Sequence, residues 1–94
     1  MLTYKAMYKF LGDAVHGEVL DFPGAITSGR DLDEARRLLA SALVDMAEIT
    51  LQHGEPLPMP DPSRTDPDAD LEEPIHLLLA ASHRVVIEPA KVAS

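Results

Sequence analysis

The residues of this chain best suited to chemistry are its carboxylates, because two-metal nucleases need several acids within about 4 Å of two ions. Asp13, Glu18, Asp21 and Asp45 are the candidates for such a site. Asp13 falls in a predicted turn, Asp21 at a predicted strand end and Asp45 on the predicted exposed side of a helix. Nothing in the pattern brings these acids together, so we expect no nuclease site and no enzyme activity.

The histidines, serines and glycines predict no other site. His16, His53, His76 and His83 lack the i, i+4 or close hairpin spacing of zinc ligands, and the chain has no Cys. The serines lack the strained glycine context of a nucleophile, and the glycines are spaced as turns rather than as a phosphate-binding loop. We therefore expect neither a metal ion nor a cofactor.

Acidic residues are concentrated in one stretch of the chain. The chain carries 16 Asp and Glu against 8 Lys and Arg, a net charge of −8. Between residues 55 and 73, Arg64 is the only Lys or Arg, and there are seven acids: Glu55, Asp61, Asp66, Asp68, Asp70, Glu72 and Glu73. A nucleic acid needs a basic patch, so DNA binding is not expected, and a basic protein is the better partner. A solvated linker is the plainer interpretation of the same run, and the general prior favours it.

Composition predicts one small domain of 94 residues, whose two Phe, two Tyr and no Trp make a lean core. Such a core often gains stability from assembly, so we expect a homo-oligomer, a dimer or a tetramer. The absence of Cys is compatible with a reducing cytosol, and no signal peptide or membrane-length apolar run is visible. These features predict a cytoplasmic protein without membrane contact.

Alternating apolar residues predict a strand over residues 2–11, with Gly12 and Asp13 as the turn. A returning strand is predicted over 15–21, where Gly17 interrupts the alternation as a bulge does. A turn at 22–24 then leads into a short third strand over 25–28. Three consecutive strands followed by a helix are typical of an antiparallel α+β arrangement.

One long helix follows, and its ends are well marked. Asp31 is the predicted N-cap with Glu34 three residues later, while Gly54 is the predicted C′ residue and Pro56 blocks continuation. Its predicted buried stripe consists of Ala35, Leu39, Ala42, Leu43, Met46 and Thr50, widened by Leu38 and Ile49. Since a one-sided helix cannot bury its stripe alone, it must pack on the sheet or on another copy of itself.

Five prolines among acids over residues 54–70 predict an extended, partly mobile connector. Beyond it, residues 75–81 suit a short helix or a strand, with the strand favoured, and 82–88 predict a further strand before a loose end at 90–94. The chain thus divides into a β-β-β-α domain (1–60), a connector (61–70) and a C-terminal extension (71–94). One or two strands of that extension complete the sheet or mediate oligomer contacts.

The order of these pieces resembles the HicB-type antitoxin family, the protein partners of HicA messenger-RNA interferases. The resemblance covers residues 1–60 and rests on the N-terminal hairpin and on DFPGAITSG (21–29), DLDEA (31–35) and HGEPLPMP (53–60). It implies a partial RNase H-like domain, with a three- or four-stranded sheet, one helix on a face and no catalytic set. It also implies an inhibitor that binds a small basic ribonuclease and occludes its active site.

The resemblance does not extend to every feature of the family, and it implies which surfaces contact the toxin and a second copy of the chain. Ala25 stands where family members often have Cys, and no basic DNA-recognition element follows Asp70, so the resemblance does not extend to operator binding. Toxin contact is expected from the seven acids of residues 55–73. Oligomer contact is expected from strand edges and from the N-terminal hairpin with Tyr4, Tyr8 and Phe10. An orphan HicB-like oligomeric module without enzymatic activity is the alternative hypothesis, and a divergent nuclease is the third.

Overall fold

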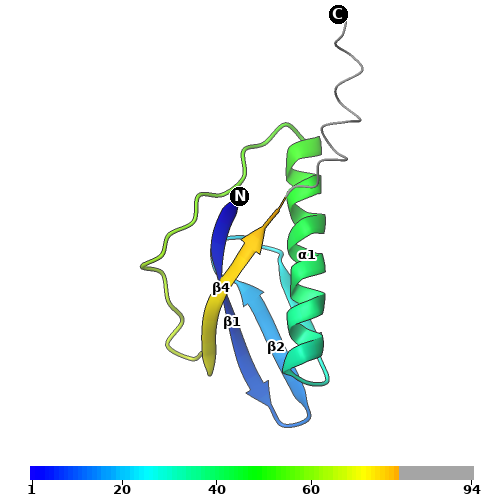
Figure 1. Ribbon diagram of the computed structural model, residues 1–94, viewed down its shortest axis with the longest axis vertical. Helices are drawn as coiled ribbons and strands as arrows, with labels where there is room; N and C mark the ends of the chain where they lie inside the picture. The colour runs from blue at the N-terminus through cyan, green and yellow to red at the C-terminus, as the bar shows by residue number, and fades with distance from the viewer. Residues whose placement is uncertain (79–94) are drawn as a thin grey trace, which may run out of the picture.

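The computed structural model describes residues 1–78, which form a four-stranded antiparallel sheet with a single helix on one face (Figure 1). The elements in chain order are β1 (Leu2–Leu11), β2 (Ala14–Val19), β3 (Ile26–Gly29), α1 (Leu32–Gln52) and β4 (Leu71–Leu77). Across the sheet the strands follow the order β3-β2-β1-β4, so the first strand lies beside the last. The predicted α+β class with a β-β-β-α-β order is therefore confirmed.

The first hairpin is fixed by a two-residue loop. Leu11 pairs with Ala14 across the loop, and Gly12 adopts a φ of +67°, the left-handed conformation that tight hairpin loops require and glycine supplies cheaply. The predicted bulge at Gly17 was wrong, because Tyr8 pairs with Gly17 in an unbroken register. The glycine instead makes room for the Tyr8 ring, since a Cβ added there would lie 3.0 Å from it.

The helix begins and ends where its caps were predicted. The Asp31 side chain accepts a hydrogen bond from the backbone N–H of Glu34 at 2.8 Å. Glu34 accepts in turn from the N–H of Arg30 at 2.7 Å, one residue earlier than in a standard capping box. At the other end His53 is the C-cap and Gly54 has a φ of +72°.

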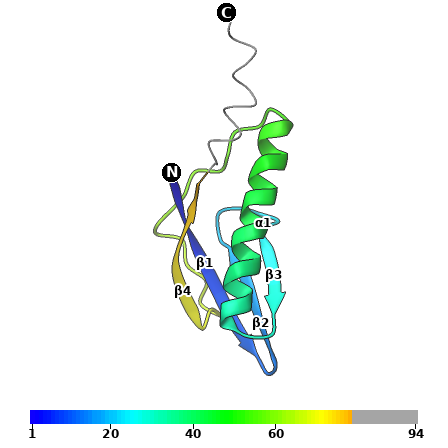
Figure 2. The same cartoon turned by 45° about the vertical axis from the view of Figure 1, so that its right-hand side comes forward.

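The buried stripe of α1 is rotated relative to the prediction. Its buried residues are Ala35, Leu39, Leu43 and Ala47. Leu38 and Ile49 do not widen this stripe, because they are 39% and 45% exposed. The helix lies over β2 and β3 and reaches β4 less (Figure 2).

The core fills the space between α1 and the sheet. Tyr4, Ala6 and Tyr8 point into it from β1, together with Val15 and Val19 from β2. Phe22, from the turn after β2, packs edge-on against Tyr4 with ring centroids 5.6 Å apart. The alternation predicted for β1 thus buries its aromatic side, and the sheet takes most of its bulky anchors from this strand.

The last strand begins earlier than the sequence indicates. Of the strand favoured for residues 75–81, residues 75–77 belong to β4, which starts at Leu71, includes Pro74 and ends at Leu77, while residues 79–81 lie outside the described part of the chain. Proline is tolerated there because β4 is an edge strand, so the missing N–H interrupts no second ladder. The strand predicted over 82–88, the end at 90–94 and His83 lie outside the described residues.

Candidate functional site

The segment between α1 and β4, residues 54–70, is called the connector from here on and includes the connector predicted over 61–70. It runs from the end of α1 back along the sheet to the start of β4 (Figure 1). It contains neither helix nor strand, as predicted. The Tyr4 hydroxyl donates to the carbonyl oxygen of Pro58 at 2.7 Å. Near the other end, the Asp70 N–H donates to the Tyr8 carbonyl at 2.9 Å, and the Asp70 carboxylate accepts from the Phe10 N–H at 2.7 Å. Both ends of the connector are thus bonded to β1.

The middle of the connector is held by one buried carboxylate and one amine. Asp21 accepts a hydrogen bond from the Asp61 N–H at 2.7 Å and pairs with the guanidinium of Arg64. Lys5 donates from Nζ to the carbonyl oxygens of Pro62 and Arg64, at 3.0 and 2.7 Å. The sequence predicted a partly mobile connector, whereas these bonds fix its path over the sheet.

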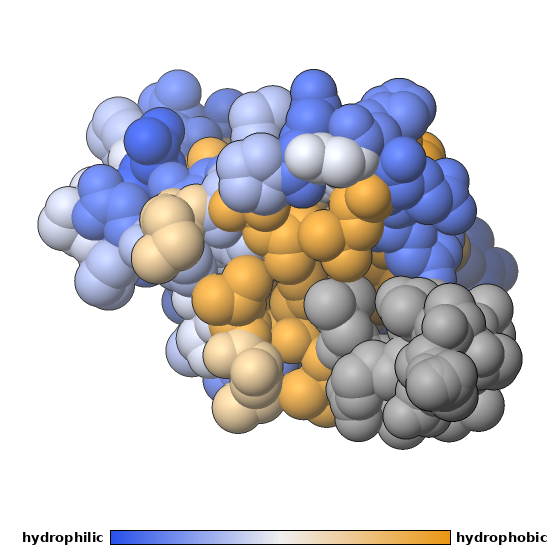
Figure 3. Space-filling view, turned by 90° about the horizontal axis from the view of Figure 1, so that it is seen from above, coloured by the Kyte–Doolittle hydropathy of each residue, from blue (hydrophilic) through white to orange (hydrophobic). Residues whose placement is uncertain are grey.

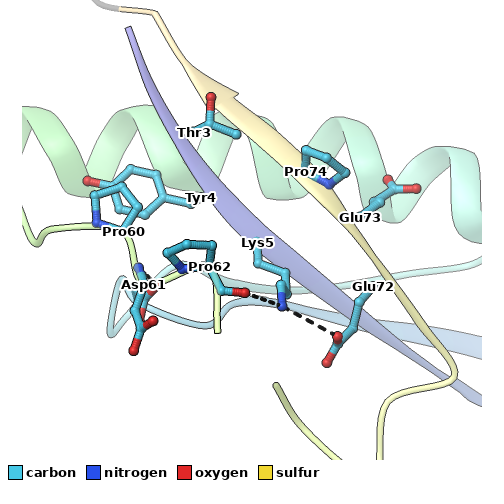
Figure 4. Close-up of a pocket in the computed structure, with 10 residues that line it drawn as sticks. Thr3, Tyr4, Lys5, Pro60, Asp61, Pro62, Glu72, Glu73 and Pro74 are labelled. Atoms are coloured by element: carbon cyan, nitrogen blue, oxygen red, sulfur yellow. Dashed lines mark hydrogen bonds and ion pairs between the residues drawn. The ribbon is translucent and has the colours of Figure 1, made fainter. Parts of the chain in front are cut away.

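A pocket of about 390 Å³ lies between the connector, β1 and β4 (Figure 4). Its apolar lining comes mainly from three prolines, Pro60, Pro62 and Pro74, because Tyr4, which also borders it, is only 2% exposed. Its charged lining combines one amine with several carboxylates, and the full lining is Thr3, Tyr4, Lys5, Asp21, Pro60, Asp61, Pro62, Glu72, Glu73 and Pro74. The pocket therefore joins apolar surface to a surplus of negative charge.

Two of these carboxylates are stabilised in their ionised form. Backbone donation from Asp66 at 2.8 Å, with the Thr65 hydroxyl and nearby Lys5, lowers the pKa of Glu72. The hydroxyl and the N–H of Ser63 lower the pKa of Asp61 in the same way. Both groups consequently carry full negative charge at neutral pH.

Burial has the opposite effect on the phenol of Tyr4. Desolvation, reinforced by the Asp21 carboxylate, raises the pKa of Tyr4. The phenol therefore stays protonated at neutral pH and remains the donor to Pro58. Lys5 sits between the Pro62 carbonyl and the Glu72 carboxylate, whose Oε1 is 3.8 Å from Nζ (Figure 4).

The seven acids predicted for partner contact do not form one cluster. Asp61, Glu72 and Glu73 line the pocket, while Asp66, Asp68 and Asp70 follow the connector and Glu55 lies exposed after the helix end. Asp68 lies 3.8 Å from Lys9, and the Asp66 carboxylate accepts from the Asp68 N–H at 2.9 Å. Most of these acids thus serve the fold, and their contact with a partner stays a prediction.

The residues predicted for oligomer contact separate in the structure. Tyr4 and Tyr8 are 2% and 1% exposed and belong to the core, whereas Phe10 is 51% exposed. Of the three side chains only Phe10 is available to a second chain, and its contact role stays a prediction.

The sequence did not indicate Lys5 or the proline walls of the pocket. The alternating prolines from Pro56 to Pro62 were the only signal that could have indicated the walls.

The candidate catalytic acids remain apart. Asp13 is in the β1–β2 loop, Asp45 is exposed on α1, and Asp21 is occupied by Asp61 and Arg64. Glu18 pairs with His16 on the same strand at 2.7 Å. Within residues 1–78, no three His, Asp or Glu side chains are grouped as metal ligands would be. In the same part of the chain, no helix combines the length and apolar character needed to cross a membrane.

Comparison with solved structures finds a protein of similar fold. No protein-family model matches this chain, and no curated protein matches it. A similar fold occurs in the crystal structure of the N-terminal domain of the Burkholderia pseudomallei antitoxin HicB, with a TM-score of 0.68 and 19% sequence identity. The match covers 83% of this chain and 100% of that one. This chain therefore shares the α+β fold of the HicB antitoxin domain.

Proposed function

We propose that this chain is a HicB-like antitoxin, which binds and neutralises a small basic messenger-RNA interferase of the HicA type. It acts by binding and performs no catalysis of its own. The observation that carries the proposal is the overlap of this fold with the whole of an antitoxin domain. The motif order over residues 1–60 is a second, independent support, because the amino-acid sequence alone resembles the same family.

Charge supports a basic partner. Exposed acids follow the connector, and ionised Asp61 and Glu72 border its pocket. Opposite charge on two proteins accelerates their encounter and selects against acidic partners, with an effect that decreases as salt increases. An acidic inhibitor of a basic ribonuclease gains both advantages.

A second candidate is an orphan oligomeric module, favoured by an apolar strip of α1 that the rest of residues 1–78 leaves partly exposed. Arg36 on α1 forms two hydrogen bonds to Glu73 on β4, at 2.9 and 2.8 Å, so this side of the helix faces β4. Val44 and Leu51 lie on the same side by helical spacing and are 37% and 44% exposed. Figure 3, which views the molecule from above the orientation of Figure 1, shows hydrophobic surface between hydrophilic flanks.

Co-expression tests the two candidates. The chain is produced with a small basic interferase of the HicA type, ideally the one encoded beside it, and growth and affinity capture are measured. We expect restored growth and a stoichiometric complex whose formation weakens with added salt. A chain that elutes alone as a defined oligomer, with growth still arrested, would instead favour the orphan module.

A further inference from the structure

The outer edge of β3 carries backbone groups that no other strand of residues 1–78 pairs with, because β3 is the last strand on its side of the sheet (Figure 2). Just before β3, the Ala25 carbonyl accepts a hydrogen bond from the Val19 N–H at 3.0 Å, in register with the β2–β3 pairs. Bonded and non-bonded pairs alternate along an antiparallel ladder, so the pairs that Ile26 and Ser28 make with β2 are non-bonded ones. Ile26 and Ser28 therefore direct their N–H and C=O groups to the outside of the sheet.

The edge of β4, on the other side of the sheet, is interrupted by a proline. The Lys5 carbonyl accepts a hydrogen bond from the Leu20 N–H on the β2 side, so the pair of Lys5 with Pro74 is a non-bonded one. The Pro74 nitrogen therefore faces outward, where it removes a donor from the middle of the edge and hinders pairing with a further strand. β3 contains no proline. Of the two edges of this sheet, the β3 edge is the one suited to pair with another chain.

An apolar side of α1 lies beside the β3 edge. Because Arg36 faces β4, helical spacing places Leu38 and Ile49 on the opposite side of the helix, toward β3. Met46, on the same side, approaches Gly24 directly before β3. Leu38 and Ile49 are 39% and 45% exposed, so residues 1–78 leave much of this side open. The surface therefore combines unpaired backbone groups with apolar side chains above them.

A second copy of the chain fits this surface because it presents the same two features. With a two-fold axis at Thr27, Ile26 lies opposite Ser28 of the second copy, and Ser28 lies opposite its Ile26. Each outward N–H of these residues then meets a C=O of the other copy, as in an antiparallel ladder. The axis is perpendicular to the sheet, so both helices stay on one face and their Leu38 and Ile49 sides approach each other. A two-fold contact is self-complementary in this way, whereas an unrelated partner would have to supply both features separately.

We propose that the edge of β3 pairs with the β3 edge of a second copy, with Thr27 on the two-fold axis, and joins the two sheets into one. The contact is independent of the proposed toxin binding. Leu38 and Ile49 lie on the opposite side of α1 from Val44 and Leu51, so the two surfaces are occupied by different copies. A tetramer built from two kinds of two-fold contact requires such a pair of separate surfaces.

Disulfide trapping tests the register on the full chain, which has no Cys of its own. Opposite residues of a non-hydrogen-bonded pair have Cα atoms about 4.5 Å apart, a distance that a disulfide spans. Thr27→Cys should therefore form disulfide-linked dimers under mild oxidation. Ser28→Cys is the control, since Ser28 is more exposed but its two copies lie diagonally, about 7–8 Å apart, and it should form about fivefold fewer dimers or less. No dimer from Thr27→Cys, or equal yields from both variants, overturns the proposal.

Further substitutions in the Thr27→Cys chain separate this contact from other surfaces. Ser28→Pro removes one outward N–H from each copy and should weaken the dimer about tenfold or more, whereas Ser28→Ala keeps the N–H and should be trapped as the parent is. Ile49→Glu leaves the β3 backbone intact and should reduce trapping, which keeps the test valid if Ser28→Pro does not fold. Val44→Glu, on the other side of α1, should not reduce it. Full trapping of a folded Ser28→Pro chain, or equal trapping of the two Glu variants, overturns the proposal.

Discussion

At the scale of single residues, Gly29 determines how closely β3 approaches the start of the helix. A Cβ added to Gly29 would lie 2.7 Å from the backbone nitrogen of Ala35, which cannot move without shifting the helix. We expect Gly29→Ala to destabilise the fold by about 1–3 kcal/mol, as overpacking does. Urea unfolding measures the loss. The neighbouring exposed Ser28→Ala is the control and should cost little, and a Gly29→Ala variant as stable as wild type would contradict the close approach.

Glu72 links stability to pH. Because hydrogen bonds from Asp66 and Thr65 lower its pKa in the folded state, Glu72 contributes stability that is present above the ordinary glutamate pKa. That contribution is lost as pH falls from the ordinary glutamate pKa through the lower, folded value. We expect Glu72→Gln to flatten the decrease in melting temperature over this acidic range.

The matched control for this titration is Asp13→Asn, which removes one carboxylate from the β1–β2 loop. Melting curves of the wild type and both variants are compared from neutral pH down to about pH 3. A Glu72→Gln profile that runs parallel to the wild-type profile would show that this carboxylate contributes nothing to the pH dependence.

At the scale of elements, the helix variants test which side of α1 is buried. Leu39 is fully buried against the sheet, whereas Leu38 is substantially exposed. Leu39→Ala should therefore cost about 2–5 kcal/mol of unfolding free energy, while Leu38→Ala should cost roughly 1 kcal/mol or less. Equal losses in the two variants would mean that the stripe predicted from the sequence, which included both residues, is the correct one.

Some elements could be predicted from the sequence because their signals are local. The alternation of β1 and the Asp31 cap each depend on residues that are close together in the sequence, and both elements were located correctly. Which side of the helix is buried depends on which strands the helix covers, and no local pattern contains that information. The pocket was still less accessible, because Tyr4, Lys5 and Asp21 meet connector residues 40 or more positions away.

The contacts between Asp21 and the connector join residues that are far apart in the sequence, and a substitution at Asp21 tests them. Asp21→Ala removes the acceptor of the Asp61 N–H and the partner of Arg64. We expect backbone amides of the connector, Asp61 first, to exchange with solvent about tenfold faster or more, while amides in the middle of α1 keep their protection. Hydrogen exchange followed by NMR measures both regions in one sample. Asp45→Ala, on the exposed side of the helix, should change neither, and an unaltered Asp61 amide would show that the Asp21 contacts are dispensable.

At the scale of the whole molecule, the small core formed by residues 1–78 leaves apolar side chains of those residues exposed. The helix covers β2 and β3 more fully than β4, so Val44 and Leu51 remain exposed on the side of α1 that faces β4 (Figure 2). Contiguous exposed apolar surface on a small protein commonly marks an interface. We therefore place the expected homo-oligomer contact at this strip rather than at the buried tyrosines of β1.

Sedimentation equilibrium of the full chain should show reversible assembly that Val44→Glu weakens, because a carboxylate at the centre of an apolar contact must be desolvated without a partner. We expect circular dichroism to show that Val44→Glu is folded, since Val44 is exposed and lies outside the core. Ser41→Glu adds the same charge on the polar side of the helix and should assemble as the wild type does. A wild-type chain that stays monomeric across the concentration range would refute the oligomer. Equal assembly of all three proteins would instead move the contact to another surface, with exposed Phe10 of the first hairpin as the next residue to test.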